Sequence, residues 1–337
     1  MSDLVLRARA PFDFAATARF LRFTDTEAVD TFAAGRYARA LHIGEQLLLL
    51  SVVKAKTPSA RPAVAVRLAP RAFVTAQTEA AATSIVRDMF SLEHDLAAWR
   101  AMLARDPLMR QLESQHRGLR LPRWPSLFEA LVTSILLQQI ATSVAITFRR
   151  RVVERYGETL EVGGETYYAF PRVERLARAS VEELRALGLS NAKAACIIEV
   201  ARACETGELS SDALAREDNE GVIARLSSLR GIGRWTAEWA LMLHFGRPDV
   251  FPAADLFLRG VVVKYYNRGA ALGEREIRAF AAKRWGGFES YSALYFLAGM
   301  RAGTITLKAE RVLSSKQSDA QPTHRAQRKT TDLNDET

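Results

Sequence analysis

The sequence of 337 residues is poor in cysteine, since Cys196 and Cys204 are its only two. Both lie in one segment with a helical pattern. Two thiols placed in this way suit neither a disulfide framework nor a zinc or iron–sulfur site with four thiolate ligands. We therefore expect a protein that works in a reducing cytoplasm.

Long apolar segments are also lacking. No apolar run reaches the eighteen residues that a membrane-spanning helix needs. The first residues, MSDLVLRARAPFDF, do not follow the basic-then-apolar pattern of a secretory signal. Internal sequence repeats are absent as well. The lack of a long apolar run and of a secretory signal pattern predicts a protein that is neither membrane-embedded nor exported, and we place it in the cytoplasm.

Positive charge, in contrast, is abundant. Lysine and arginine number 47 against 38 aspartates and glutamates, which gives a formal net charge of +9. Such an excess is typical of proteins that bind a polyanion, because the counterions released from nucleic acid favour binding. A basic surface without a polyanionic partner is the alternative that the charge alone leaves open.

The hydrophobic pattern changes along the chain. The segments YARALHIGEQLLLLSVVKA and RPAVAVRLAP are rich in strand-forming residues, and the second alternates apolar and polar positions. From about Thr83 onward the pattern is helical almost without a break. One helical segment begins with a Ser126 cap, continues through LFEALVTSILLQQIATSVAITFRRRVVERY, and ends at Gly157. Another, SVEELRALGLSNAKAACIIEVARACETGEL, predicts a helix pair whose first member has a capping box of Ser180 and Glu183.

These patterns predict a mostly α fold with an N-terminal α+β domain. We place that domain at residues 1–90 and a helical domain at 91–311. The segment 312–337 is polar, mixed in charge and has almost nothing to bury, so we predict a disordered tail there.

The segment SLRGIGRWTAEWALMLHF predicts a helical hairpin. Gly231 and Gly233 flank Ile232, so one helix ends, the chain reverses, Ile232 tucks between the helices, and the next helix begins at once. The unpaired amides at a helix N-terminus can bind a phosphate without any side chain. An ordinary hairpin ended by glycine is the alternative, and the basic charge favours phosphate binding.

Asp255 lies within the strongly apolar segment DVFPAADLFLRGVVV. One role open to it is that of a cap for a helix beginning at Leu256. The other is that of an unpaired carboxylate at the mouth of a pocket, where it would meet a developing positive charge. The two roles do not exclude each other.

Taken together, residues 219–260 resemble the helix-hairpin-helix, Gly/Pro-rich loop and aspartate motif (HhH-GPD) of the DNA glycosylase superfamily. FEALVTSILLQQIATSVA and FPRVERLARASVEELRALGLSNAKAACIIEVARA resemble its core helices. APFDF and YARALHIGE are similar to the N-terminal sheet domain of the bacterial 3-methyladenine DNA glycosylase II family. The resemblance covers roughly residues 4–305 and implies two helical subdomains with a small antiparallel sheet domain. The hairpin would span 219–244 and the catalytic loop 245–260.

The resemblance implies a base excision repair enzyme. It would act as a monomer on damaged double-stranded DNA, flip out an alkylated purine such as 3-methyladenine, and hydrolyse its N-glycosidic bond. Superfamily members that also nick the strand place a lysine where this chain has Trp235, so the resemblance predicts no lyase activity. The alternatives are a glycosylase for other damaged bases and a non-catalytic helix-hairpin-helix module that only binds DNA.

The resemblance also implies roles for individual residues. Asp255 matches the catalytic aspartate, which stabilises the oxocarbenium-like sugar. Trp235 and Trp239 match aromatic residues of the base pocket, although aromatic residues at this helical spacing are also common in protein cores. Leu297 stands where the family has a pocket tryptophan, which is a departure from its pattern. Further base-pocket positions are Phe20 and Tyr295.

Other matches concern DNA and ions. Gln139 matches the residue that wedges into the gap left by the flipped base, and a polar residue on a solvated helix face is the alternative. The matched hairpin contacts to DNA are Gly231, Ile232, Gly233 and Thr236. The family also implies a monovalent cation held by the backbone carbonyls of Ser227, Leu229 and Ile232. We expect no other cofactor and no iron–sulfur cluster.

Overall fold

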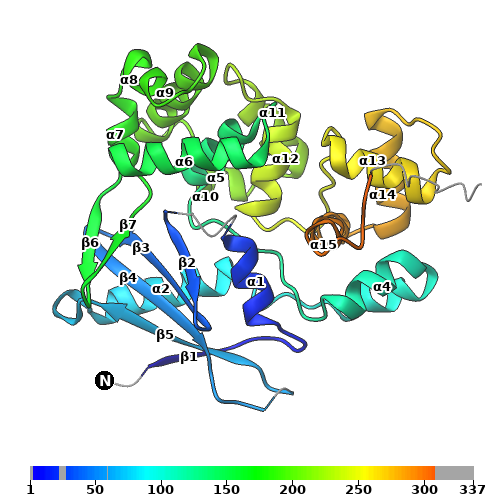
Figure 1. Ribbon diagram of the computed structural model, residues 1–337, viewed down its shortest axis with the longest axis horizontal. Coiled ribbons are helices and arrows are strands. Elements are labelled where there is room, and N and C mark those ends of the chain that lie inside the picture. The colour runs from blue at the N-terminus through cyan, green and yellow to red at the C-terminus, as the bar shows by residue number, and fades with distance from the viewer. Residues whose placement is uncertain (1–2, 23–27, 59, 308–337) are drawn as a thin grey trace, which may run out of the picture. The chain divides into compact units, whose positions relative to one another are not determined.

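The computed structural model describes residues 3–22, 28–58 and 60–307 of the protein. Strands dominate the N-terminal part and helices the remainder (Figure 1). The predicted fold class, mostly α with an N-terminal α+β domain, is therefore confirmed. The tail predicted at 312–337 lies outside the described residues, and the domain boundary at residue 90 stays a prediction.

The N-terminal sheet has five strands in the order β1-β5-β4-β3-β2, and every neighbouring pair is antiparallel. The two β-rich segments of the sequence form its centre, where strand-favouring Val residues and apolar Leu and Ala residues point alternately to the two faces. The strands are β1 (Leu4–Arg7), β2 (Asp30–Ala33), β3 (Arg36–Ile43), β4 (Gln46–Lys54) and β5 (Ala63–Ala69).

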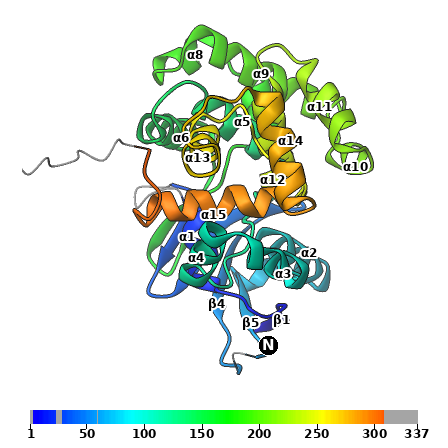
Figure 2. The same cartoon turned by 90° about the vertical axis from the view of Figure 1, so that its right-hand side faces the viewer.

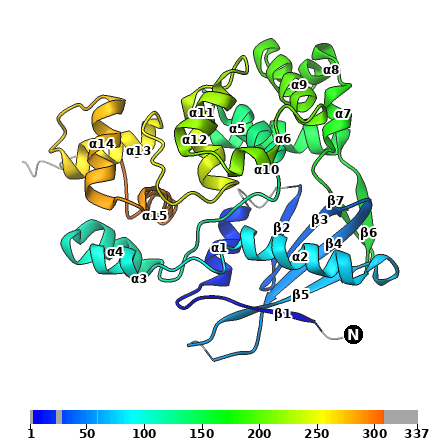
Figure 3. The same cartoon turned by 180° about the vertical axis from the view of Figure 1, so that it is seen from behind.

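One face of this sheet is covered by two helices, α1 (Phe14–Leu21) and α2 (Ala76–Met89). Side chains of both helices pack with Tyr37 and Leu41 of β3 in one buried cluster. Figure 3 shows α2 lying across this face. A short 3₁₀ turn, η1 (Arg71–Phe73), joins β5 to the segment before α2. The packing fixes α1, whose last turn carries Phe20, against the sheet.

The opposite face of the sheet is covered by a hairpin from the helical part, which the sequence did not predict. Its strands are β6 (Thr159–Val162) and β7 (Glu165–Tyr168). Tyr167 packs against alanines of β3 and Leu49 of β4. The hairpin interrupts the helical pattern only briefly, which is why periodicity alone missed it.

The remaining helices form two separate cores. One core is built from α5 to α12, and the other from α3, α4 and α12 to α15. Helix α12 belongs to both, because Leu241 faces the first core and Met242 the second. This arrangement agrees with the two predicted helical subdomains. The helices are α3 (Ala97–Met102), η2 (Leu103–Arg105), α4 (Pro107–Gln115), α5 (Leu127–Leu137), α6 (Thr142–Tyr156), α7 (Val173–Ala177), α8 (Val181–Ala186), α9 (Asn191–Glu205), α10 (Ser211–Ala215), α11 (Asn219–Ser227), α12 (Arg234–Leu243), α13 (Leu256–Tyr266), α14 (Glu274–Trp285) and α15 (Glu289–Arg301).

The predicted caps form where the sequence placed them. The Ser126 hydroxyl accepts a hydrogen bond from the Glu129 amide (3.1 Å), and Ser180 and Glu183 form a capping box. The single helix predicted from Ser126 to Gly157 is wrong, however. It is divided into α5 and α6 by a loop in which Gln139 has a φ of 55°. That conformation cannot continue a right-handed helix.

Within residues 3–22, 28–58 and 60–307, no helix is long and apolar enough to cross a membrane.

Candidate active site

A cavity of about 450 Å³ lies where α1, the α5–α6 loop, α12, α13 and α15 meet. Figure 2 shows α15 between α1 and the helices α12 to α14. The wall is mostly apolar and aromatic, and its charged residues are Asp255 and Arg301. A second hollow, of about 650 Å³ between α8, α9 and α11, has no aromatic residue in its wall. The first cavity is therefore the candidate site for a planar aromatic ligand.

Asp255 reaches the cavity from the N-terminus of α13. Its Oδ1 accepts hydrogen bonds from the amides of Phe257 (3.0 Å) and Leu258 (3.1 Å), and its Oδ2 accepts one from the Trp235 indole N–H (3.2 Å). Asp255 is thus both a helix cap and a cavity residue. The prediction that its carboxylate is unpaired is wrong. Three donors fix the direction of the carboxylate, and its half-buried position leaves it facing the cavity.

Trp235 and Trp239 form one aromatic wall of the cavity. They are one helical turn apart on α12, with ring centroids separated by 6.1 Å and planes inclined by 66°. The indole N–H of Trp235 is engaged by Asp255, whereas that of Trp239 is buried and has no hydrogen-bond partner within residues 3–22, 28–58 and 60–307. Trp235 therefore couples the aromatic wall to the carboxylate.

The hairpin between α11 and α12 has the predicted form. Gly231 adopts a φ of 89°, and Ile232 is buried, with its amide donating to the Leu229 carbonyl (3.1 Å). Gly233 is exposed and caps α12 with an extended backbone, and a Cβ placed on it would meet nothing within 4 Å. The first amides of α12 follow directly and have no partner within the helix. An anion can therefore approach this backbone closely.

The side chain of Thr236 faces the protein, so a contact of this residue with DNA stays a prediction for its backbone amide alone. It is 1% exposed, and its hydroxyl accepts a hydrogen bond from the Gln138 side chain (3.0 Å), which also donates to the Gly231 carbonyl (3.0 Å). The residue that covers Thr236 is thus Gln138, which sequence reasoning passed over. The predicted wedge, Gln139, is the exposed neighbour of Gln138 in the same loop. Gln138 ties this loop to the hairpin.

Comparisons with known proteins agree with this geometry. Residues 132–286 match the model of the HhH-GPD superfamily base excision DNA repair proteins, and residues 3–126 match that of the AlkA N-terminal domain. DNA-3-methyladenine glycosylase 2 of Escherichia coli K12 is 30% identical over 293 residues, which cover 86% of this chain and 95% of that protein. DNA-3-methyladenine glycosylase of Bacillus subtilis is 32% identical over 210 residues, or 62% and 69% of the two chains. The solved structure of 3-methyladenine DNA glycosylase from Archaeoglobus fulgidus superposes with a TM-score of 0.77 at 26% identity and covers 90% of this chain and all of the other.

The chain belongs to the HhH-GPD superfamily.

In this HhH-GPD protein, the remaining base-pocket predictions have different outcomes. Phe20 lines the cavity from α1, and so does Leu297 from α15. Tyr295 does not. It is fully buried and packs against Trp99 with ring centroids 4.6 Å apart and planes inclined by 54°. Its hydroxyl donates to backbone carbonyls of the segment after α4. The reason is the helical phase, because Tyr295 points away from the side of α15 that carries Leu297.

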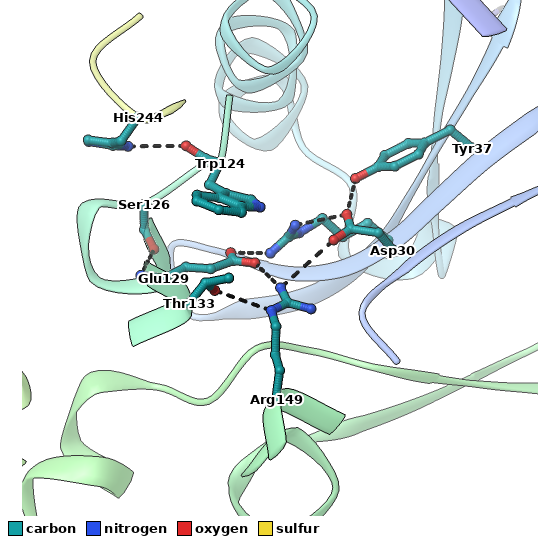
Figure 4. Close-up of polar contacts among 9 residues, drawn as sticks. Asp30, Tyr37, Trp124, Ser126, Glu129, Thr133, Arg149 and His244 are labelled. Carbon is teal, nitrogen blue, oxygen red and sulfur yellow. Dashed lines mark hydrogen bonds and ion pairs between the residues drawn. The ribbon is translucent and has the colours of Figure 1, made fainter. Parts of the chain in front are cut away.

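The α5 helix of this HhH-GPD protein is held against the sheet by a buried charged cluster (Figure 4). The Arg39 guanidinium of β3 donates to Asp30 of β2 (2.9 Å) and to Glu129 of α5. The Arg149 guanidinium of α6 donates to Glu129 (2.6 Å) and Thr133 (3.2 Å). Burial acts most strongly on Glu129 and raises the pKa of its carboxyl, while both guanidiniums act to lower it. The cluster fixes α5 and α6, and the Gln138–Gln139 loop joins these two helices.

Proposed function

We propose that the cavity is the base pocket in which this glycosylase for alkylated bases hydrolyses the N-glycosidic bond of a flipped purine. The observation that carries the proposal is the position of Asp255, a charged wall residue beside two tryptophans and near a phosphate-binding type of hairpin. A duplex holds its bases inside the stack, so a pocket of this kind needs the damaged nucleotide to be flipped out.

Asp255 would stabilise the reacting sugar. As the base leaves, positive charge develops on the sugar, and a carboxylate beside it lowers the energy of that state. The three hydrogen bonds hold the carboxylate in one direction, so little reorganisation is needed during the reaction. An N-alkylated purine such as 3-methyladenine is already cationic and leaves as a neutral base. One carboxylate can therefore suffice without a separate acid.

The DNA backbone would be held by the hairpin. The backbone of Gly233 and of the first turn of α12 would bind a phosphate, whereas the buried side chains of Thr236 and Ile232 would support this backbone from beneath. Gln139 is exposed at the tip of the α5–α6 loop and has the position of a wedge for the gap left by the flipped base. We propose that one protomer carries out these steps on damaged double-stranded DNA.

The hairpin also fits a monovalent cation, a ligand that the superfamily implies. The carbonyls of Ser227 and Leu229 follow the last turn of α11, where helical carbonyls lack partners within the helix. The Leu229 carbonyl accepts one hydrogen bond, from Ile232, and keeps a second lone pair. Ser227, Leu229 and Ile232 would hold such an ion through carbonyl oxygens, and it would supply positive charge for a phosphate.

Hydrolysis without lyase activity is supported by the surroundings of the two lysines closest in sequence to the motifs, Lys193 and Lys264. Trp235 stands at the position where lyases of the superfamily have lysine. The Lys193 amine is half-buried and donates to the Leu136 carbonyl (2.7 Å). The Lys264 amine donates to the Thr306 carbonyl (2.8 Å). We infer that neither amine is poised to attack the sugar.

The test is product analysis on duplex DNA treated with a methylating agent. We expect free 3-methyladenine in the supernatant and intact strands that break at abasic sites only after alkali. Binding without release of any base would identify a DNA-binding module instead. Release of oxidised bases but not methylated ones, from suitably damaged duplexes, would identify a glycosylase of another specificity.

A further inference from the structure

One side chain in the wall of the cavity carries a positive charge. Arg301, in the last turn of α15, lines the wall, and its guanidinium carbon lies 4.1 Å from the centroid of the Phe20 ring. One of its N–H groups donates to the Arg19 carbonyl at 3.4 Å. The residue as a whole is exposed, but its guanidinium end is desolvated, which lowers the pKa of the group without bringing it near neutrality.

This contact changes what the pocket offers to a base. A cationic purine is attracted by the face of an aromatic ring. One face of Phe20 is already occupied by the guanidinium, which forms the same kind of contact. A second cation in the same cavity would also be repelled by the charge of Arg301. Phe20 therefore favours cationic bases less than an unoccupied aromatic ring would.

We propose that Arg301 is a specificity-determining residue of this pocket, which weakens the preference of the aromatic wall for cationic bases and extends excision to neutral damaged purines that present hydrogen-bond acceptors. The proposal rests on the proposed function, since it requires the cavity to be the base pocket. The planar fork of a guanidinium matches two adjacent acceptors on one base edge, as when arginine binds O6 and N7 of a purine. Hypoxanthine presents this edge and carries no charge.

The same group would assist the departure of a neutral base. When the bond from C1′ to N9 breaks, its electron pair stays on the base, which becomes anionic and spreads the charge toward O6 and N7. A guanidinium that donates to these atoms stabilises the charge. The water oxygen then bonds to C1′, and the proton released by that water ends on the base. A cationic purine leaves as a neutral molecule and gains nothing from the guanidinium.

The test compares two lesions in one sequence context, hypoxanthine and the cationic 7-methylguanine, under single-turnover conditions. Arg301→Met keeps the length of the side chain and removes its charge and donors. We expect excision of hypoxanthine to fall at least about tenfold, the size of one lost bidentate contact. We expect excision of 7-methylguanine to rise, because the repulsion is removed and Phe20 is uncovered. Arg19→Met removes an exposed arginine outside the cavity and controls for net charge.

Opposite changes for the two lesions would support the proposal, because a purely structural role of Arg301 moves both rates in one direction. Equal losses for both lesions, no change in either, or a wild-type protein that does not excise hypoxanthine would overturn it. So would an Arg19→Met variant with the same pattern. Asp255→Asn distinguishes this failure from that of the proposed function, since it should abolish excision of both lesions whatever Arg301 does.

Discussion

Substitutions at the two glycines of the hairpin can test separately how the turn folds and how it contacts DNA. At Gly231 the φ of 89° is in the left-handed region, and a Cβ would lie 3.0 Å from the Cys196 sulfur. At Gly233 the backbone is extended, with φ −98° and ψ 174°, and a Cβ would point into open space. Alanine at these two positions therefore tests different properties.

The expected energies follow from this geometry. Gly231→Ala places a side chain in a left-handed conformation, which costs about 1–2 kcal/mol, and the contact with Cys196 adds to it. Gly233→Ala gains about 0.4–1 kcal/mol from the less flexible unfolded chain and loses a similar amount at the helix cap, where alanine is worse than glycine, so the free energy of unfolding should change by less than about 0.5 kcal/mol. If a phosphate approaches this backbone, however, the added methyl group would hold it away.

The assay combines thermal unfolding with DNA binding across a range of salt concentrations. We expect Gly233→Ala to unfold like the wild type but to bind duplexes of any sequence more weakly, with a smaller dependence of affinity on salt. Gly231→Ala should lower the melting temperature. A Gly233→Ala protein with wild-type affinity at every salt concentration would show that the hairpin does not bind phosphate through its backbone.

Two further predictions concern protonation and covalent chemistry. Burial lowers the pKa of His244 to about 4, below its ordinary value in the unfolded chain; protonation therefore favours unfolding, and the free energy of unfolding should fall as the pH drops from about 6.5 toward 4. His244→Gln should flatten this part of a plot of the free energy of unfolding against pH. A residual slope should remain from His94, because burial lowers its pKa to about 4 as well. An unchanged slope would contradict the assignment to His244. Borohydride added during base excision should trap no covalent protein–DNA adduct, because position 235 holds a tryptophan where lyases of the superfamily have the lysine that forms the Schiff base. An adduct that disappears in Lys193→Ala would show instead that the enzyme forms a Schiff base.

The parts of the fold set by local chemistry could be predicted from the sequence. The central strands of the sheet are short apolar segments between turn residues, the Ser126 and Ser180 caps act on their own helices, and the glycines of the hairpin define the turn. The break after α5 could not be predicted in this way, because the apolar spacing continues through Gln139. What ends the helix there is a tertiary contact, the hydrogen bonds from Gln138 to the hairpin.

The site residues that lie within one sequence motif could be predicted. Those that segments distant in the sequence bring to the cavity could not. Asp255 and the two tryptophans lie within one stretch of sequence, and the structure brings them to one cavity. Tyr295 was misplaced because the phase of α15 depends on packing against α3 and α4. Arg301 gave no signal in the sequence, since its role depends on Phe20, which lies almost the whole chain away.

The most direct test of the account is the single-turnover rate of 3-methyladenine release by Asp255→Asn. A half-buried carboxylate about 4 Å from a full positive charge contributes on the order of 4 kcal/mol at an effective dielectric constant of about 20, which corresponds to roughly a thousandfold in rate. Asparagine can still accept a hydrogen bond as a cap, so the fold and the affinity for DNA should remain close to those of the wild type. We predict a loss of about a thousandfold in the rate with DNA binding retained. A loss of less than about tenfold would contradict the central claim that the Asp255 charge drives excision.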